Sequence, residues 1–240
     1  MTGIRLAFTW LTVLPLRGPS TVDRRLAGGA IALAPIVGLV LGAAAGAVWC
    51  LLCLAGAAPI VSGFVVVAFL ALATRGMHLD GLSDTFDGLG TYGTPERARE
   101  VMKSGPAGPF GVVAIVLVIA LQATSFAQLE PIAIGLSIVA GRVAVVAACA
   151  RGAGPVPADG FGALVAATQS RWIAATWFFV LCGASVLVSP LGPAVVAGAA
   201  LLGALFVQHC VRRLGSVNGD VLGALTEVTV AVTAVGLSFL

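Results

Sequence analysis

The chain has 240 residues, of which 59% are hydrophobic and only 10% are charged, and its formal net charge is +3. A soluble domain carries about 25% charged residues, so thirteen basic and ten acidic side chains are too few to cover a soluble globule of this size. The composition therefore excludes a soluble globular protein, a disordered chain and a nucleic-acid-binding module, and it predicts an all-α integral membrane protein.

The predicted helices follow from the lengths of the apolar segments, because a hydrocarbon core about 30 Å thick is crossed by roughly 20 apolar residues. Residues 4–16 are too few to cross, and with Trp10 and flanking arginines they predict an interfacial or re-entrant helix. No small-residue cleavage site follows this segment, so we do not expect a signal peptide. Seven further segments predict transmembrane helices: 29–54, 59–73, 110–128, 131–150, 172–189, 193–211 and 221–240.

The basic residues agree with this arrangement of about seven transmembrane helices plus an N-terminal interfacial helix. Twelve of the thirteen lie before the first span or in alternate loops on one side, and the loops near residues 57, 129 and 191 have none. Only Arg142 falls inside a span. Lys and Arg stay on the cytoplasmic side, so we expect a multi-pass protein with a cytoplasmic N-terminus. We expect residues 1–240 to form a single membrane domain with a cytoplasmic active-site segment at residues 75–109.

Three aspartates give this polar segment its chemistry. Asp80, Asp84 and Asp87 are spaced by four and three residues, which places them within roughly 60° on one face of a helix. A solvated helix face is the alternative interpretation, but Leu79 and Phe86 interleave with the acids and no lysine neutralises them. Three like charges on one face repel each other. A divalent cation such as Mg²⁺ or Mn²⁺, which prefers oxygen ligands, would relieve that repulsion.

The second half of the segment suits a phosphate group. Lys103, Ser104 and the glycines of residues 105–108 precede the third long span, with Arg97 and Arg99 close by. Open backbone amides at a helix entrance and nearby cations bind anions. A plain turn is the alternative for these residues.

Two acids in the last polar segment share a helix face, because Asp220 and Glu227 are seven residues apart. A carboxylate inside a membrane helix is by default a functional-site hypothesis. The alternative is a structural role, in which such a carboxylate forms an ion pair with Arg142 or His209. His78 lies two residues before Asp80, where an orienting role and acid–base chemistry both remain open.

Three motifs resemble the cobalamin synthase family, adenosylcobinamide-GDP ribazoletransferase: MHLDGLSDTFDGLG at 77–90, EVMKSGPAGPFGVVA at 100–114 and RRLGSVNGDVLGALTE at 212–227. Shorter matches at residues 8–16, 34–42 and 159–166 extend the resemblance over nearly the whole chain. The aspartate motif is the most specific of these. Many relatives carry an Asp where this chain has Ser104, and a Gly-Gly where it has Gly215-Ser216.

The resemblance implies the last assembly step of coenzyme B12 in the bacterial inner membrane. Adenosylcobinamide-GDP would react with α-ribazole or its 5′-phosphate, and GMP would leave. The family uses Mg²⁺, which we assign to Asp80, Asp84 and Asp87, with Asp87, His78 or Asp220 as the base. The expected substrate contacts are Lys103, Arg75, Ser104, Arg213, Asn218, Asp220 and Glu227. Other late cobamide-assembly enzymes are the expected protein partners.

Two other classes share some of these features. Enzymes of the CDP-alcohol phosphotransferase type also use spaced aspartates on membrane helices, but their signature has Ala-Arg where this chain has Leu82-Ser83. A transporter or Mg²⁺ channel would explain ionisable residues within spans. The acids, however, cluster on one side of the predicted membrane domain.

Overall fold

The computed structural model describes residues 2–240, which form twelve α-helices. Six of them, α3, α4, α6, α7, α8 and α11, have a proline in their first turn, where its missing N–H costs no hydrogen bond. The helices are α1 (Thr2–Leu11), α2 (Arg24–Ala32), α3 (Ala34–Leu54), α4 (Pro59–Ala73), α5 (Met77–Gly90), α6 (Pro95–Met102), α7 (Pro109–Phe126), α8 (Pro131–Ala148), α9 (Gly160–Val165), α10 (Arg171–Ser185), α11 (Gly192–Leu214) and α12 (Gly219–Leu237).

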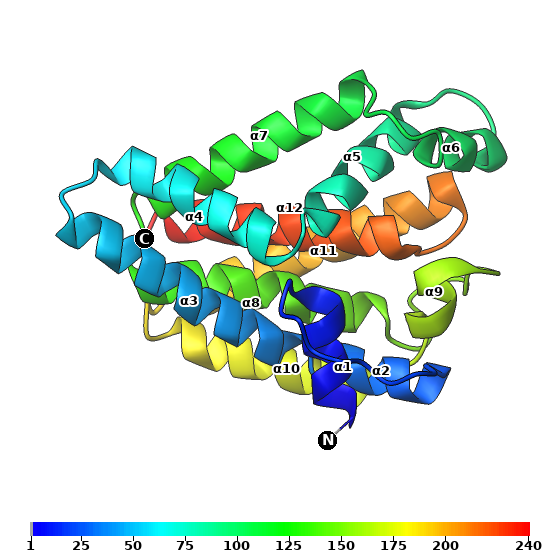
Figure 1. The fold of residues 1–240 in the computed structure, drawn as a ribbon, viewed down its shortest axis with the longest axis horizontal. Coiled ribbons are helices and arrows are strands. Elements are labelled where there is room, and N and C mark those ends of the chain that lie inside the picture. Colours follow the sequence, from blue (N-terminus) through cyan, green and yellow to red (C-terminus); the bar gives the residue numbers. More distant parts are fainter. Residues whose placement is uncertain (1) are drawn as a thin grey trace.

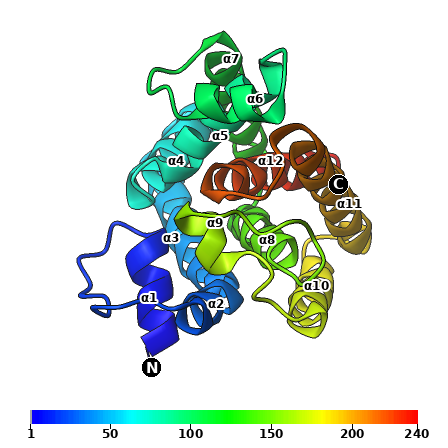
Figure 2. The same cartoon turned by 90° about the vertical axis from the view of Figure 1, so that its right-hand side faces the viewer.

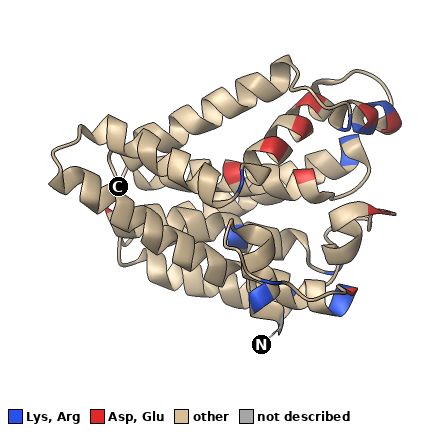
Figure 3. Cartoon of the chain, viewed as in Figure 1, with Lys and Arg blue, Asp and Glu red and all other residues tan. Residues whose placement is uncertain are grey.

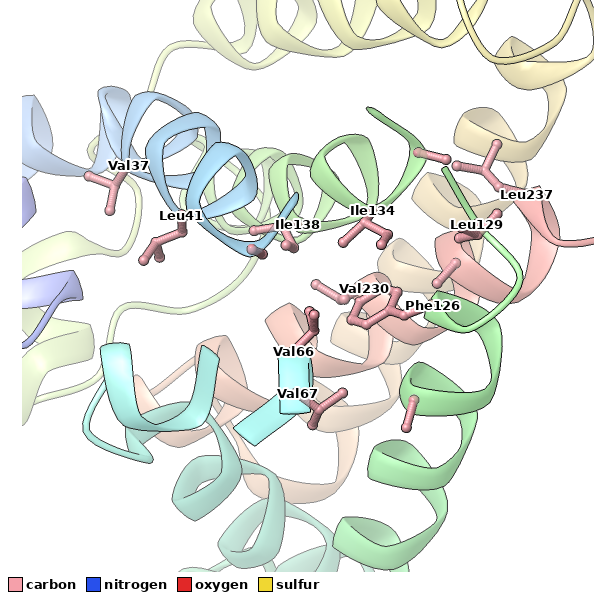
Figure 4. Packing of buried hydrophobic residues seen from close by; sticks show 14 of the residues in the cluster. Val37, Leu41, Val66, Val67, Phe126, Leu129, Ile134, Ile138, Val230 and Leu237 are labelled. Atoms are coloured by element: carbon pink, nitrogen blue, oxygen red, sulfur yellow. The ribbon is translucent and has the colours of Figure 1, made fainter. Parts of the chain in front are cut away.

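The long helices run along one common direction, and α8 lies in the middle of the bundle, between α3, α10 and α12 (Figures 1 and 2). Apolar side chains from several helices meet there, as Figure 4 shows. Leu41 of α3, Val66 of α4, Phe126 of α7, Ile138 of α8 and Val230 of α12 are all buried in this cluster. This cluster holds α3, α4, α7, α8 and α12 together, and α5 packs directly on α12 beside the candidate site.

Five helices are each long and apolar enough to cross a membrane: α3, α7, α8, α11 and α12. A sixth span is possible if α4 and α5 count as one, although they are bent by 93°. By length and composition the structure thus has five or six candidate spans where about seven were predicted, and all seven predicted segments are helical. The shortfall is in length, because α4 and α10 have 15 residues each and span about 22 Å. Leu51, Leu117 and Leu201 expose apolar surface outward from the long helices, as lipid contact requires.

Two predicted boundaries also differ from the structure. The first predicted span, 29–54, is divided at Leu33 into α2 and α3, because Pro35 cannot continue the hydrogen-bonding pattern of the preceding helix. The predicted interfacial helix ends at Leu11 and not at residue 16. Pro15 disfavours a helical conformation at the residue before it.

The charged residues gather at one end of the bundle, which we call the charged end (Figure 3). It contains α5, α6, α9 and the start of α12, so the polar segments that are far apart in the sequence meet there. Glu130 is an acid at the opposite end, where it precedes α8.

Candidate active site

A sharp bend positions the aspartate helix α5. Arg75 and Gly76 both have positive φ angles, 57° and 67°, and they turn the chain between α4 and α5. Helix α5 then packs on α12 at very short range. A Cβ atom at Gly81 would lie 2.7 Å from the backbone oxygen of Asp220, and one at Gly223 would lie 3.3 Å from Cα of His78. Glycine at both positions therefore lets the backbones approach and brings the acids of the two helices together.

The carboxylates of this helix pair repel one another. Helix α5 lies outside the five spans, and Asp80 is exposed on it while Asp84 is half-buried. Partial burial raises the pKa of Asp84 to about 6, and the negative charges of Asp80, Asp220 and Asp87 add to this effect. A site that concentrates negative charge in this way favours a cation.

The donor set fits Mg²⁺ and not a metal held by protein alone. Within residues 2–240, no three His, Cys, Asp or Glu side chains are arranged to hold a metal ion by themselves. Mg²⁺ does not require such a cage, because it keeps several waters and takes one or two carboxylates plus substrate phosphates. Asp80 and Asp84 offer such a pair.

Asp87, the third predicted metal ligand, caps helix α7. Its Oδ2 accepts a hydrogen bond from the Gly108 amide at 2.7 Å, and its Oδ1 accepts one from the Gly111 amide at 2.9 Å. A Cβ atom at Gly108 or Gly111 would collide with this carboxylate. The Gly108 amide is therefore not open to a phosphate, contrary to the prediction for this turn. The nearby arginines are also engaged, since Arg97 pairs with Glu100 and Arg99 with Glu96.

Two cavities open at the charged end and share three wall residues: Phe161, Gly219 and Asp220. The inner cavity has a volume of about 420 Å³ and is enclosed by α1, α5, α8, α9 and α12. The outer cavity has about 770 Å³ and lies between α6, α12 and the loop before α9. A third cavity, between α8, α10 and α11, has no Asp, Glu, Lys or Arg in its wall. Asp220 is thus the acid at the junction of the two charged-end cavities.

The structure brings some of the predicted substrate contacts into these walls. Lys103 and Asn218 line the outer cavity. Asn218 also caps α12 by accepting from the Val221 amide, and its Nδ2 donates to Oδ2 of Asp220 at 3.2 Å. Arg75 lines the inner cavity.

Ser104 and Arg213 lie outside both walls. The Ser104 hydroxyl donates to the carbonyl of Val101 at 2.7 Å, and Arg213 donates to the carbonyl of Thr91 at 2.8 Å. Both side chains therefore bond to backbone carbonyls of the chain and lie outside the two cavities.

Glu227 belongs to a buried polar group behind the inner cavity. Its Oε2 accepts from Nε2 of Gln122 at 2.7 Å, and its Oε1 lies 3.6 Å from Nδ1 of His78. His78 is in the inner cavity wall, whereas Glu227 is not. Asp220 and Glu227 therefore do not line one cavity, contrary to the prediction, because the Glu227 carboxylate turns toward Gln122 and His78.

Sequence reasoning missed three wall residues of the inner cavity. Trp10 and Phe161 pack edge to face with ring centroids 5.0 Å apart. They come from distant parts of the chain, so only the fold unites them. Arg142 is the third of these residues. Its isolated position inside an apolar span was the sequence feature that could have identified it.

The profile of the family described as cobalamin-5-phosphate synthase matches residues 3–238. Adenosylcobinamide-GDP ribazoletransferase from Frankia casuarinae is 40% identical over 97% of this chain and 93% of its own length. The protein of the same description from Nocardioides sp. is 40% identical over 95% of each chain, and the one from Corynebacterium efficiens 37% identical over 97% and 90%. No solved structure matches the chain. The chain therefore belongs to the cobalamin-5-phosphate synthase family.

Proposed function

We propose that this protein is an adenosylcobinamide-GDP ribazoletransferase, which completes the nucleotide loop of cobalamin. The acceptor is α-ribazole or its 5′-phosphate, and the products are adenosylcobalamin or its 5′-phosphate, together with GMP. The observation that carries the proposal is the meeting of two cavities at Asp220, beside the carboxylates of Asp80 and Asp84. A transferase that joins two substrates needs two adjoining sites. Family membership favours this enzyme over the two other classes considered from the sequence, a CDP-alcohol phosphotransferase and a transporter or Mg²⁺ channel.

Asp80 and Asp84 are the residues that would hold Mg²⁺ against the diphosphate of the donor. When bound, the metal supplies neutralisation of the negative charge on the diphosphate and on departing GMP. Lys103 lies at the end of α6 in the outer cavity wall, where its ammonium group donates to phosphate oxygens. The outer cavity is the larger of the two, so we assign it to the nucleotide end of the donor.

Asp220 is the residue we assign as the base. It accepts the proton of the ribazole 3′-hydroxyl while the hydroxyl oxygen bonds to the phosphorus attached to the corrinoid. The bond from that phosphorus to the bridging oxygen breaks, and GMP leaves with the electron pair. Asn218 orients the carboxylate through its hydrogen bond to Oδ2. Asp87 has both oxygens on backbone amides and His78 faces Glu227, which favours Asp220 over the other two candidates.

We also propose that the charged end faces the cytoplasm of a bacterial inner membrane. The basic residues support this orientation, because twelve of the thirteen lie before the first predicted span or in alternate predicted loops on one side. In this arrangement residues 1–240 act as one membrane domain, with segment 75–109 at the cytoplasmic surface. The bilayer would support the large corrinoid, and other late cobamide-assembly enzymes would deliver the substrates.

The experiment uses purified protein in liposomes with adenosylcobinamide-GDP, α-ribazole 5′-phosphate and Mg²⁺. Chromatography should detect GMP and the new corrinoid in equal amounts, and EDTA should stop both. A folded protein that releases no GMP with either acceptor would refute the proposal.

A further inference from the structure

Arg142 has a buried guanidinium group that makes no direct polar contact with another side chain of the described residues. It lies on α8 about two turns from the charged end, and it is only 4% exposed. Within residues 2–240 it forms no ion pair, and no side-chain hydrogen bond is found for it. Its side chain lines the inner cavity. Glu227 acts on the guanidinium electrostatically from behind the cavity but forms no salt bridge with it. A buried charge that is not directly paired is unfavourable, so the guanidinium would bind an anion that enters the cavity.

His78, in the same wall, does not compete with Arg142 for such an anion. Nδ1 of His78 is buried without a hydrogen-bond partner, and its nearest acid oxygen, Oε1 of Glu227, is 3.6 Å away. This nitrogen faces Glu227 and not the cavity, so Arg142 of α8 is the buried cationic group of the inner wall that an anion can reach. A group with several oxygens, such as a phosphate monoester, would satisfy the several N–H donors of the guanidinium.

The depth of the cavity limits which phosphate can reach Arg142. Wall residues Asp220 and Thr226 are six residues apart on α12, which corresponds to about 9 Å. The donor carries its diphosphate between two large groups, the corrinoid and guanosine, and these would hold it at the cavity mouth. A terminal phosphate on a small riboside has no such obstruction.

We propose that the inner cavity is the acceptor site and that Arg142 binds the 5′-phosphate of α-ribazole 5′-phosphate. This inference rests on the proposed function and deepens it by assigning a specificity-determining residue. The aromatic base of the acceptor lies against Trp10 and Phe161, and the ribose 3′-hydroxyl points to Asp220 at the junction. The contact makes the phosphorylated acceptor the preferred one.

The test compares the two acceptors in wild type and in Arg142→Gln. The quantity measured is the ratio of kcat/KM for α-ribazole 5′-phosphate to kcat/KM for α-ribazole. We expect the wild-type ratio to exceed one and to fall by about 10- to 100-fold in the variant, as for loss of a hydrogen bond to a charged group. Arg142→Lys keeps the positive charge but loses the planar pair of N–H donors of the guanidinium. Its ratio should therefore lie between those of wild type and Arg142→Gln. Arg151→Gln, on an exposed residue beyond α8, should keep the wild-type ratio.

Equilibrium dialysis without donor provides a readout that does not depend on turnover. Wild type should retain radiolabelled α-ribazole 5′-phosphate more tightly than α-ribazole, and Arg142→Gln should lose that difference. Equal wild-type affinities would overturn the inference, even if the variants fail to fold. So would an equal loss for both acceptors in Arg142→Gln, which is the result of a purely structural role. Tight binding of the phosphorylated acceptor without any GMP release would instead contradict the proposed function alone.

Discussion

Asp87 and Asp84 are predicted to respond in opposite ways to the same substitution. Asp87→Asn replaces one of the two oxygens that accept from Gly108 and Gly111, and the new amide group faces a backbone N–H at a position that is 8% exposed. Leaving a buried group unsatisfied costs about 1–3 kcal/mol. For a chain of this length that corresponds to a fall in Tm of about 2–12 °C.

Asp84→Asn is the matched control. Asp84 is half-buried among like charges, so removing its charge relieves repulsion and should leave Tm in EDTA unchanged or higher. The assay is thermal unfolding in detergent, followed by tryptophan fluorescence, with EDTA or with Mg²⁺. Wild type and Asp87→Asn should both gain stability from Mg²⁺, whereas Asp84→Asn should gain little. An Asp87→Asn protein with wild-type Tm in EDTA and no response to Mg²⁺ would refute the role of Asp87 as the cap of α7. It would make Asp87 a metal ligand instead.

Three further substitutions test the packing and the walls. Gly81→Ala places a Cβ 2.7 Å from the backbone oxygen of Asp220, so α5 and α12 must move apart. It should reduce kcat by about 100-fold, since a misplacement of about 1 Å in an active site has that effect. Near-normal kcat would mean that the contact between the two helices is loose. Lys103→Gln should raise KM for the donor by about tenfold, as expected for a lost charged hydrogen bond, and an unchanged KM at low salt would exclude the contact. Glu227→Gln weakens the bond with Gln122 and should lower Tm by about 2–4 °C with little change in kcat; normal Tm with lost turnover would make Glu227 part of the active site.

The helix content and the acidic face were predictable because they depend on local sequence. Apolar segment lengths predicted seven helices, and the spacing of Asp80 and Asp84 predicted their common face. The number of spans was less predictable, because the predicted bounds 59–73 match α4, but only the structure shows the bend of 93° between α4 and α5.

The remaining site required the fold. The same spacing rule placed Asp87 with the other acids, but its carboxylate bonds to amides 21 and 24 residues away. Asp220 and Glu227 share a helix face, but the Glu227 carboxylate turns toward Gln122 and His78, so only Asp220 reaches the cavities. Arg142 was visible as a lone charge in a span, whereas the cavity beside it depends on α5, α8 and α12 meeting.

The most direct test of the account is GMP formation by Asp220→Asn in proteoliposomes under single-turnover conditions. The account predicts that binding of donor and Mg²⁺ is retained, while the rate of GMP formation falls by at least about 100-fold, the usual contribution of a general base. Asp23→Asn is the control, because Asp23 lies outside both cavities and asparagine preserves its cap on α2. A rate for Asp220→Asn within a few-fold of wild type would contradict the assignment of the reaction to the junction of the two cavities.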